Sequence, residues 1–371
     1  MKTFGDKAHG ARLERMQASP RWTGNGFRNL HPVIAGLRDP NASMPSISDF
    51  IWGGERRVPT RPLPAADPLG IWKRAPQSGL RATWLGHSTV LLEIDGLRVL
   101  TDPVWGSRAS PFPMLGPKRF QPVPVALRSL PPLDLIVVSH DHYDHLDYPT
   151  IRELAKRHVP FVTSLGVGAY LQAWGVLPEL IFELDWWESY RLPDTGLSVT
   201  AAPSQHFSGR SFRSRNTTLW SSMVVRSEHH AVFFSGDTGL TTEYTRIREG
   251  LGPFDLVMLE VGAHHPGWGD MHLGPENALK ALALLGGGAL LPVHWGTFSL
   301  AMHAWDQPAE VLLERGTKAD AQLLMPRLGE PIEPVRAQKA EPWWRGVDTA
   351  GYQPNRAGAI LVPQTLSGPI D

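Results

Sequence analysis

The feature that most constrains this 371-residue chain is a dense group of metal-competent side chains directly after a short apolar run. Residues 135–138 read Leu-Ile-Val-Val, and residues 139–145 read Ser-His-Asp-His-Tyr-Asp-His. Neutral imidazole nitrogens and carboxylate oxygens are ligands of Zn²⁺ and similar divalent ions. The alternative is a polar loop rich in histidine. Without a bound ion, however, placing so many titratable side chains together would gain the protein little. We interpret the segment as a metal site at the end of a strand.

Composition and charge narrow the remaining function classes. The sequence has 36 Lys and Arg against 36 Asp and Glu, so no net charge attracts nucleic acid or an anionic membrane. It has no cysteine, which excludes disulfides and thiolate zinc sites. The first 20 residues lack an apolar stretch, and no window reaches the roughly 18 apolar residues of a membrane span. We therefore expect a soluble cytoplasmic protein that does not bind nucleic acid and is at most peripheral to the inner membrane face.

The composition and hydrophobic periodicity of the chain change near residue 80. Residues 1–80 are rich in Pro, Gly and Arg and show little periodicity, which predicts an N-terminal arm wrapping the main domain. Disorder is the alternative for its first 20 residues. From residue 81 onward, apolar strands alternate with amphipathic helices, which predicts one layered α/β domain over residues 81–371. Strands are expected at 134–139, 160–163, 197–202, 231–235, 255–260 and 289–293, and helices at 149–158, 166–174, 241–250, 275–285 and 307–315.

Three of the later strands also end in metal-competent side chains. The strands at 197–202, 231–235 and 289–293 run into His206, Asp237 and His294. Sites in α/β sheets gather beyond the carboxyl ends of strands, so these side chains are expected to meet. The full set of candidate ligands is His140, His142, Asp144, His145, His206, Asp237 and His294. One tetrahedral zinc needs three or four ligands, so seven suit two ions about 3.5–4 Å apart that share a carboxylate and a water.

This ligand pattern resembles the metallo-β-lactamase fold superfamily, and further motifs are similar to one of its branches. The motifs occupy residues 84–90, 100–103, 107–111, 116–120, 139–148, 216–220, 234–239 and 294–298. The branch is the N-acylphosphatidylethanolamine-hydrolysing phospholipase D family, and the similarity covers about residues 80 to 305. The resemblance implies a four-layered αββα sandwich and a metal-dependent hydrolase.

Carried onto this sequence, the resemblance implies two zinc sites that share Asp237 as a bridge. The first site is held by His140, His142 and His206. The second site is held by Asp144, His145 and His294. Histidine and carboxylate ligands also suit Mn²⁺ or Fe. The implied reaction is phospholipase D-type hydrolysis, in which a bridging hydroxide attacks a phosphodiester such as N-acylphosphatidylethanolamine.

The expected catalytic residues are Asp144, Asp237 and His272. His272 matches an active-site histidine of the family and is expected to bind the substrate phosphate or to donate a proton. A surface histidine that opens a helix is the alternative reading. His264 and His265 are alternative candidates for this role. They lie nearer the end of the preceding strand, but neither matches the family pattern.

Arg210 and Trp268 complete the expected substrate-binding residues. Arg210, with Arg213 and Arg215, could attract an anionic head group, although a solvated loop is the commoner explanation for such residues. Trp268 is one of several aromatic residues that could line an acyl groove. The other candidates for this groove are Trp105, Phe112, Phe120, Trp186 and Trp187, together with the apolar side chain of Met114.

Two further polar residues follow apolar strands. A lone histidine beside apolar strands is more often structural, so we expect His87 not to touch the site. Asp102 is a plausible acceptor for the N–H of a ligand histidine, with a turn before Pro103 as the alternative.

Ligand residues alone do not separate the chemistries open to such a site. The alternative enzyme is a lactonase or other carboxylic ester hydrolase on the same metal site. A non-catalytic metal-binding protein would be expected to lack some ligands, whereas this set is complete. The expected partner is a small-molecule or lipid phosphodiester, and the resemblance also allows a homodimer.

Overall fold

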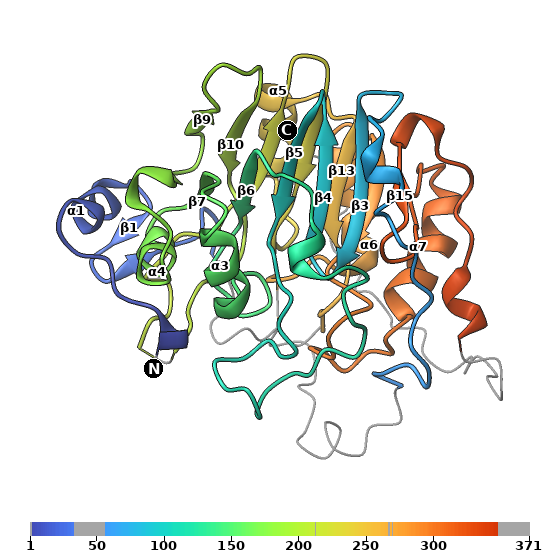
Figure 1. Ribbon diagram of the computed structural model, residues 1–371, viewed down its shortest axis with the longest axis horizontal. Coiled ribbons are helices and arrows are strands. Elements are labelled where there is room, and N and C mark those ends of the chain that lie inside the picture. The colour runs from blue at the N-terminus through green and yellow to red at the C-terminus, as the bar shows by residue number, and fades with distance from the viewer. Residues whose placement is uncertain (1, 33–55, 212, 266–267, 269, 348–371) are drawn as a thin grey trace.

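The computed structural model describes residues 2–32, 56–211, 213–265, 268 and 270–347. Within them, the strands form two large sheets and one small ribbon, and helices lie on the outer sides of the sheets (Figure 1). The ribbon pairs β1 (Trp22–Thr23) with β2 (Gly26–Phe27) in the N-terminal segment.

The first large sheet has the strand order β15-β3-β4-β5-β6-β7-β8. Its strands are β3 (Leu80–Gly86), β4 (Thr89–Ile94), β5 (Leu97–Thr101), β6 (Leu135–Val138), β7 (Phe161–Ser164), β8 (Ile181–Leu184) and β15 (Pro331–Ile332). Strands β3 to β5 are antiparallel. Asp95 and Gly96, both with positive φ, form the two-residue turn between β4 and β5. Strands β5 to β8 are parallel, so loops and helices must connect them.

The second large sheet has the strand order β14-β13-β12-β11-β10-β9. Its strands are β9 (Ser189–Arg191), β10 (Ser198–Ala202), β11 (Ser222–Arg226), β12 (Ala231–Phe234), β13 (Leu256–Glu260) and β14 (Ala289–Val293). Strands β9 to β12 are antiparallel, and β12 to β14 are parallel.

The alternation of side chains along β6 shows how the layers are built. Leu135 and Val137 join the core that the two sheets share, whereas Ile136 and Val138 join a second core on the other face. Helices α3 (Tyr148–Ala155) and α4 (Gly168–Ala173) cover that second face, and α5 (Glu243–Leu251) and α6 (Gly274–Leu284) cover the far side of the other sheet. The expected four-layered αββα sandwich is therefore confirmed.

Local sequence signals explain where the helices begin. The Asp147 side chain accepts a hydrogen bond from the Thr150 N–H at 3.3 Å and caps α3, while Pro149 occupies its first turn. Pro275 and Pro308 occupy the first turns of α6 and α7 (Gln307–Lys318). The six strands expected after residue 133 and the five expected helices all occur, with bounds within three residues.

The N-terminal segment packs against the main domain. Helix α1 (Gly10–Ala18) places Met16 in a small core with Phe27, Leu165 and Trp220. The described residues there are ordered as a helix and a ribbon, and residues 33–55 of the expected arm lie outside the described residues. No helix in the described part of the chain is long and apolar enough to cross a membrane.

Candidate metal centre

The candidate ligands meet at one edge of the two sheets. Five strands end at that edge, and each is followed by a loop that carries at least one candidate ligand: β3, β6, β10, β12 and β14. The loops bring together side chains that are more than 200 residues apart in the sequence, as between His87 and His294. The rule that sites collect beyond strand ends therefore holds for this fold.

The first group consists of His140, His142, His206 and Asp237, whose ligand atoms all lie within 4.8 Å of one another. His142 Nδ1 is 2.9 Å from His140 Nε2 and 3.2 Å from His206 Nε2. Asp237 Oδ2 is 3.6 Å from His206 Nε2. Ligand atoms around a tetrahedral zinc with bonds of 2.0–2.1 Å are about 3.3 Å apart, so these four side chains fit one ion.

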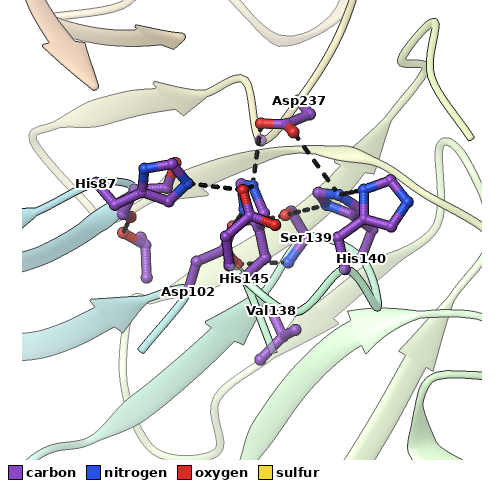
Figure 2. Close-up of polar contacts among 12 residues, drawn as sticks. His87, Asp102, Val138, Ser139, His140, His145 and Asp237 are labelled. Carbon is purple, nitrogen blue, oxygen red and sulfur yellow. Dashed lines mark hydrogen bonds and ion pairs between the residues drawn. The ribbon is translucent and has the colours of Figure 1, made fainter. Parts of the chain in front are cut away.

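The second group consists of His87, Asp144, His145 and His294. Asp144 Oδ2 is 2.8 Å from His87 Nε2, 3.2 Å from His294 Nε2 and 3.5 Å from His145 Nε2. Asp237 Oδ1 approaches the same group, at 3.1 Å from His145 Nε2 and 3.2 Å from His294 Nε2. The two oxygens of Asp237 therefore face different groups, an arrangement that would suit a carboxylate shared by two ions (Figure 2).

Among the described residues, four buried polar atoms of these two groups lack a hydrogen-bond partner: His87 Nδ1, His145 Nε2, Asp237 Oδ1 and His294 Nδ1. Leaving such atoms unsatisfied in a protein interior costs about 1–3 kcal/mol each. His145 Nε2 and Asp237 Oδ1 lie 3.1 Å apart among the candidate ligand atoms, where a cation would satisfy them. The donor set therefore fits one or two divalent ions.

Hydrogen bonds from surrounding residues hold the ring nitrogens of His145 and His206 that do not face the other candidate ligands. Asp102 Oδ2 accepts from His145 Nδ1 at 2.6 Å and from the Ser139 hydroxyl at 2.6 Å (Figure 2). His206 Nδ1 donates to the Met271 carbonyl at 2.9 Å. Such contacts fix the orientation of a ring and leave its second nitrogen for a metal. As expected, Asp102 accepts a hydrogen bond from a histidine of the candidate ligand set, His145.

Burial and opposite charges compete at the centre. Burial alone would lower the pKa of His145, but Asp237 and Asp144 raise it well above the ordinary value. Burial also opposes ionisation of Asp237, yet His145 and His294 hold the pKa of this carboxyl well below its usual range. The carboxylates therefore favour protonation of His145, whereas burial lowers the pKa of His140, His142 and His206.

Sequence reasoning misplaced His87 and missed Glu260. The expectation that His87 does not touch the site is wrong, because its Nε2 contacts Asp144. Glu260 was not among the candidates, although it is fully buried and ends β13. Its position at a strand end is the same signal that identified Asp237 and His294.

Glu260 holds His272 at the edge of the centre. Glu260 Oε2 is 2.7 Å from His272 Nδ1, and its Oε1 accepts from the N–H groups of Thr238 and Leu273 at 2.9 and 3.1 Å. The His272 ring lies 5.0 Å from the His206 ring, between centroids. Burial would lower the pKa of His272, whereas Glu260 raises it above the ordinary value. His264 instead stacks on His303 at 4.8 Å.

Arg210 does not lie where a head group could reach it. Its side chain is buried, and its guanidinium donates to the carbonyls of Asp141, Leu146 and Thr3. The expectation that Arg210 binds substrate is therefore corrected: its side chain is buried, and both of its terminal nitrogens donate to backbone carbonyls. Arg213 is exposed, and exposed Arg215 stacks over the Phe207 ring at 4.9 Å.

The aromatic residues expected to line a groove fall into two kinds. Trp105 and Trp186 use their indole N–H groups on the carbonyls of Val125 and Trp220 and belong to the packing. Trp268 lies beside the centre, with its ring 6.4 Å from that of His272. The remaining residues with large exposed apolar surface on the β5–β6 loop are Phe112, Met114 and Leu115.

Comparisons with known proteins agree with this geometry. The family model described as the beta-lactamase superfamily domain matches residues 97–295. An uncharacterised protein of Mycobacterium tuberculosis is 43% identical over 333 residues, which are 89% of this chain and 88% of the relative. The N-acyl-phosphatidylethanolamine-hydrolyzing phospholipase D 1 of Caenorhabditis elegans is 35% identical over 269 residues, 68% of this chain and 76% of the relative.

The solved structures add evidence for the fold. The isothiocyanate hydrolase from Delia radicum gut bacteria superposes with a TM-score of 0.55 at 20% identity, over 68% of this chain and 98% of that one. Together with the family match and the phospholipase D relative, this likeness bears out the resemblance seen in the motifs. The chain therefore belongs to the beta-lactamase superfamily, in the branch of the N-acyl-phosphatidylethanolamine-hydrolysing phospholipase D relatives, and is a metal-dependent hydrolase.

Proposed function

We propose that the protein is a dizinc phosphodiesterase of the phospholipase D type. The observation that carries this proposal is the position of Asp237, whose two oxygens face two separate groups of ligand atoms. One zinc would bind His140, His142, His206 and Asp237. The other would bind Asp144, His145, His294 and Asp237, with His87 in contact with Asp144. The 35% identical phospholipase D supports a phosphodiester substrate.

Two bound zinc ions would supply a hydroxide near neutral pH and polarise the attacked P–O group. Asp237 and Asp144 contribute the negative charge that offsets two dications in a buried site. Hydrolysis at phosphorus forms one P–O bond to the attacking oxygen and breaks the bond to the alcohol. The departing alkoxide then takes a proton, and a histidine is the common source of such a proton.

His272 is the proposed proton donor or phosphate ligand. Its Nδ1 is held by Glu260, so Nε2 is the nitrogen left to contact the substrate. Among the described residues, His272 Nε2 has no hydrogen-bond partner. Trp268 lies beside this ring and is proposed to contact the substrate. Arg210 has no part in this proposal, because its side chain is buried and both terminal nitrogens donate to backbone carbonyls.

Two exposed apolar side chains on the β5–β6 loop support a lipid substrate. Met114 and Leu115 are 81% and 65% exposed at the tip of the β5–β6 loop. Farther along this loop, Arg119 pairs with Phe298 through a backbone bridge, and the Phe298 ring lies 5.2 Å from His87. The β5–β6 loop that carries the two exposed residues is therefore joined at Arg119 to a segment beside His87. We propose that the protein acts in the cytoplasm and touches a bilayer only peripherally, through this tip.

The test is an assay of purified, metal-quantified protein on three substrates: N-acylphosphatidylethanolamine in mixed micelles, a small aryl phosphodiester and a panel of lactones. We expect phosphodiester hydrolysis with release of an N-acylethanolamine from the lipid. His142→Ala serves as the inactive control for contaminating hydrolases. Turnover of lactones without turnover of either phosphodiester would overturn the proposal in favour of an ester hydrolase.

A further inference from the structure

Arg210 lies four residues after His206 and has only 3% of its surface exposed. Its Nη1 donates to two backbone carbonyls, that of Asp141 at 2.7 Å and that of Leu146 at 2.9 Å. These two residues flank segment 142–145, which carries three of the seven candidate ligands named above. One guanidinium nitrogen therefore joins both ends of that segment.

Further hydrogen bonds join the same two loops. The Tyr143 hydroxyl donates to the Arg210 carbonyl at 2.6 Å, and the Gly209 N–H donates to Asp141 Oδ1 at 2.7 Å. The guanidinium carbon of Arg210 also lies 4.0 Å from the centroid of the Tyr143 ring. The loop after β10, which carries His206, is thus tied to the loop after β6 through backbone and side chain together.

The surroundings of Arg210 require a flat, forked cation. Among the described residues, no carboxylate forms a salt bridge with it. Its charge meets backbone carbonyls and the faces of aromatic rings, with Trp174 at 5.0 Å and Tyr170 at 5.7 Å from the guanidinium carbon. A lysine ammonium is a compact point charge that cannot reproduce the planar fork or the stacking.

We propose that Arg210 is a positioning residue for the metal centre. By holding segment 142–145 against the loop that follows His206, it fixes the 3.2 Å separation between His142 Nδ1 and His206 Nε2. This inference rests on the ligand set of the proposed function and assigns the geometry of that set to a side chain outside it. Arg210 touches neither the ligand atoms nor the space between them.

The test measures zinc binding by the full-length Arg210→Lys variant. We expect the zinc affinity of the first group to fall about 10–100-fold, the range found when outer contacts of ligand histidines are lost. Zinc affinity is read by competition with a chromophoric chelator. The visible absorption of the cobalt-substituted variant should also change, because the separation of the coordinating nitrogens changes. Neither readout depends on catalytic activity.

Arg157→Lys is the matched control. Arg157 also donates to three backbone carbonyls, those of Leu127, Leu130 and Pro131, at 2.8, 3.2 and 3.1 Å, and it follows the carboxyl end of α3, away from the centre. We expect its replacement to lower thermal stability while leaving zinc affinity unchanged. Comparing the two variants separates loss of packing from loss of ligand geometry.

Tyr143→Phe provides a second, milder variant if Arg210→Lys does not fold. It removes only the hydrogen bond to the Arg210 carbonyl and should speed zinc dissociation severalfold. Wild-type zinc affinity and cobalt spectra in both variants would overturn the positioning role. If instead the ligand assignment of the proposed function is wrong, the result differs: zinc content would be unchanged in His142→Ala, or the wild-type protein would bind no zinc.

Discussion

Glu260 Oε2 lies 2.7 Å from His272 Nδ1, so a fully buried carboxylate at the end of β13 fixes the orientation of the proposed proton donor. The same oxygen lies 3.7 Å from Nδ1 of His294, a proposed ligand. The other oxygen, Oε1, accepts from two backbone N–H groups and cannot rotate away without leaving both unpaired. Glu260 therefore connects the metal centre to the residue that would act on the leaving group.

Glu260→Gln should lower kcat about 10–100-fold, as loss of an orienting outer contact commonly does. The amide oxygen must take the Oε1 position to accept from the N–H groups of Thr238 and Leu273. The NH₂ group then faces His272 Nδ1 and donates where Glu260 accepted. His272 loses the carboxylate that stabilises its protonated form. Steady-state kinetics with zinc quantification checks this, and an unchanged kcat at full zinc occupancy would contradict it.

Removing a ligand shared by both groups should lower the zinc content more than removing a ligand of one group. His142 contacts only the first group, so His142→Ala should lose about one of two zinc ions. Asp237 faces both groups, so Asp237→Asn should lower the occupancy of both. Turnover should be abolished in each variant. The measurement is metal analysis after dialysis, with the exposed His229→Ala as control; equal zinc loss in both variants would contradict the bridging role.

The sequence predicted the layers and the position of the site because both follow from local patterns. Val137 and Val138 alternate between two cores, and His206, Asp237 and His294 each follow a recognisable apolar strand. The contacts of Arg210 could not be predicted this way. Whether an arginine in a loop reaches solvent or a buried carbonyl depends on how two distant loops pack.

Short or polar elements were harder to predict for a similar reason. Strand β9 (Ser189–Arg191) has no apolar alternation of its own and exists because it pairs with β10. Helix α1 buries only Met16, so its pattern carries little signal. His87 was missed because its partner Asp144 lies 57 residues away in the sequence.

Zinc binding to the metal-free protein should release protons at pH 7. Burial tends to lower the pKa of His294, but Asp237 and Asp144 raise it to about 10, and the pKa of His145 also lies well above 6.5. Both rings are therefore protonated in the metal-free fold. Their ion pairs stabilise that fold fully below about pH 6.5, and this stabilisation is lost as pH rises through the raised values.

A metal ligand must be a neutral imidazole, so zinc displaces these protons and binds more tightly as pH rises. Calorimetric titration in buffers of different ionisation enthalpy measures the number of protons released. Zinc affinity should increase between pH 6 and pH 8. A binding enthalpy that does not depend on the buffer would contradict the raised pKa values of His145 and His294.

Asn29 should contribute to zinc binding even though it lies in the N-terminal segment. Its Nδ2 donates to the His206 carbonyl at 2.8 Å, and its Oδ1 accepts from the His206 N–H at 3.0 Å and from Trp220 Nε1 at 3.1 Å. Asn29→Ala leaves the backbone polar groups of His206 without these partners, which should cost about 1–3 kcal/mol of unfolding free energy. It should also weaken zinc binding by the first group.

Urea unfolding of the metal-free protein and chelator competition measure these two effects separately. Asn25→Ala is the matched control, because Asn25 is exposed in the turn between β1 and β2. We expect this control to match wild type in both measurements. If Asn29→Ala unfolds at the same urea concentration as Asn25→Ala and binds zinc equally well, the N-terminal segment does not support His206. Loss of zinc affinity confined to Asn29→Ala would instead show that residues near the start of the chain help to form the metal centre.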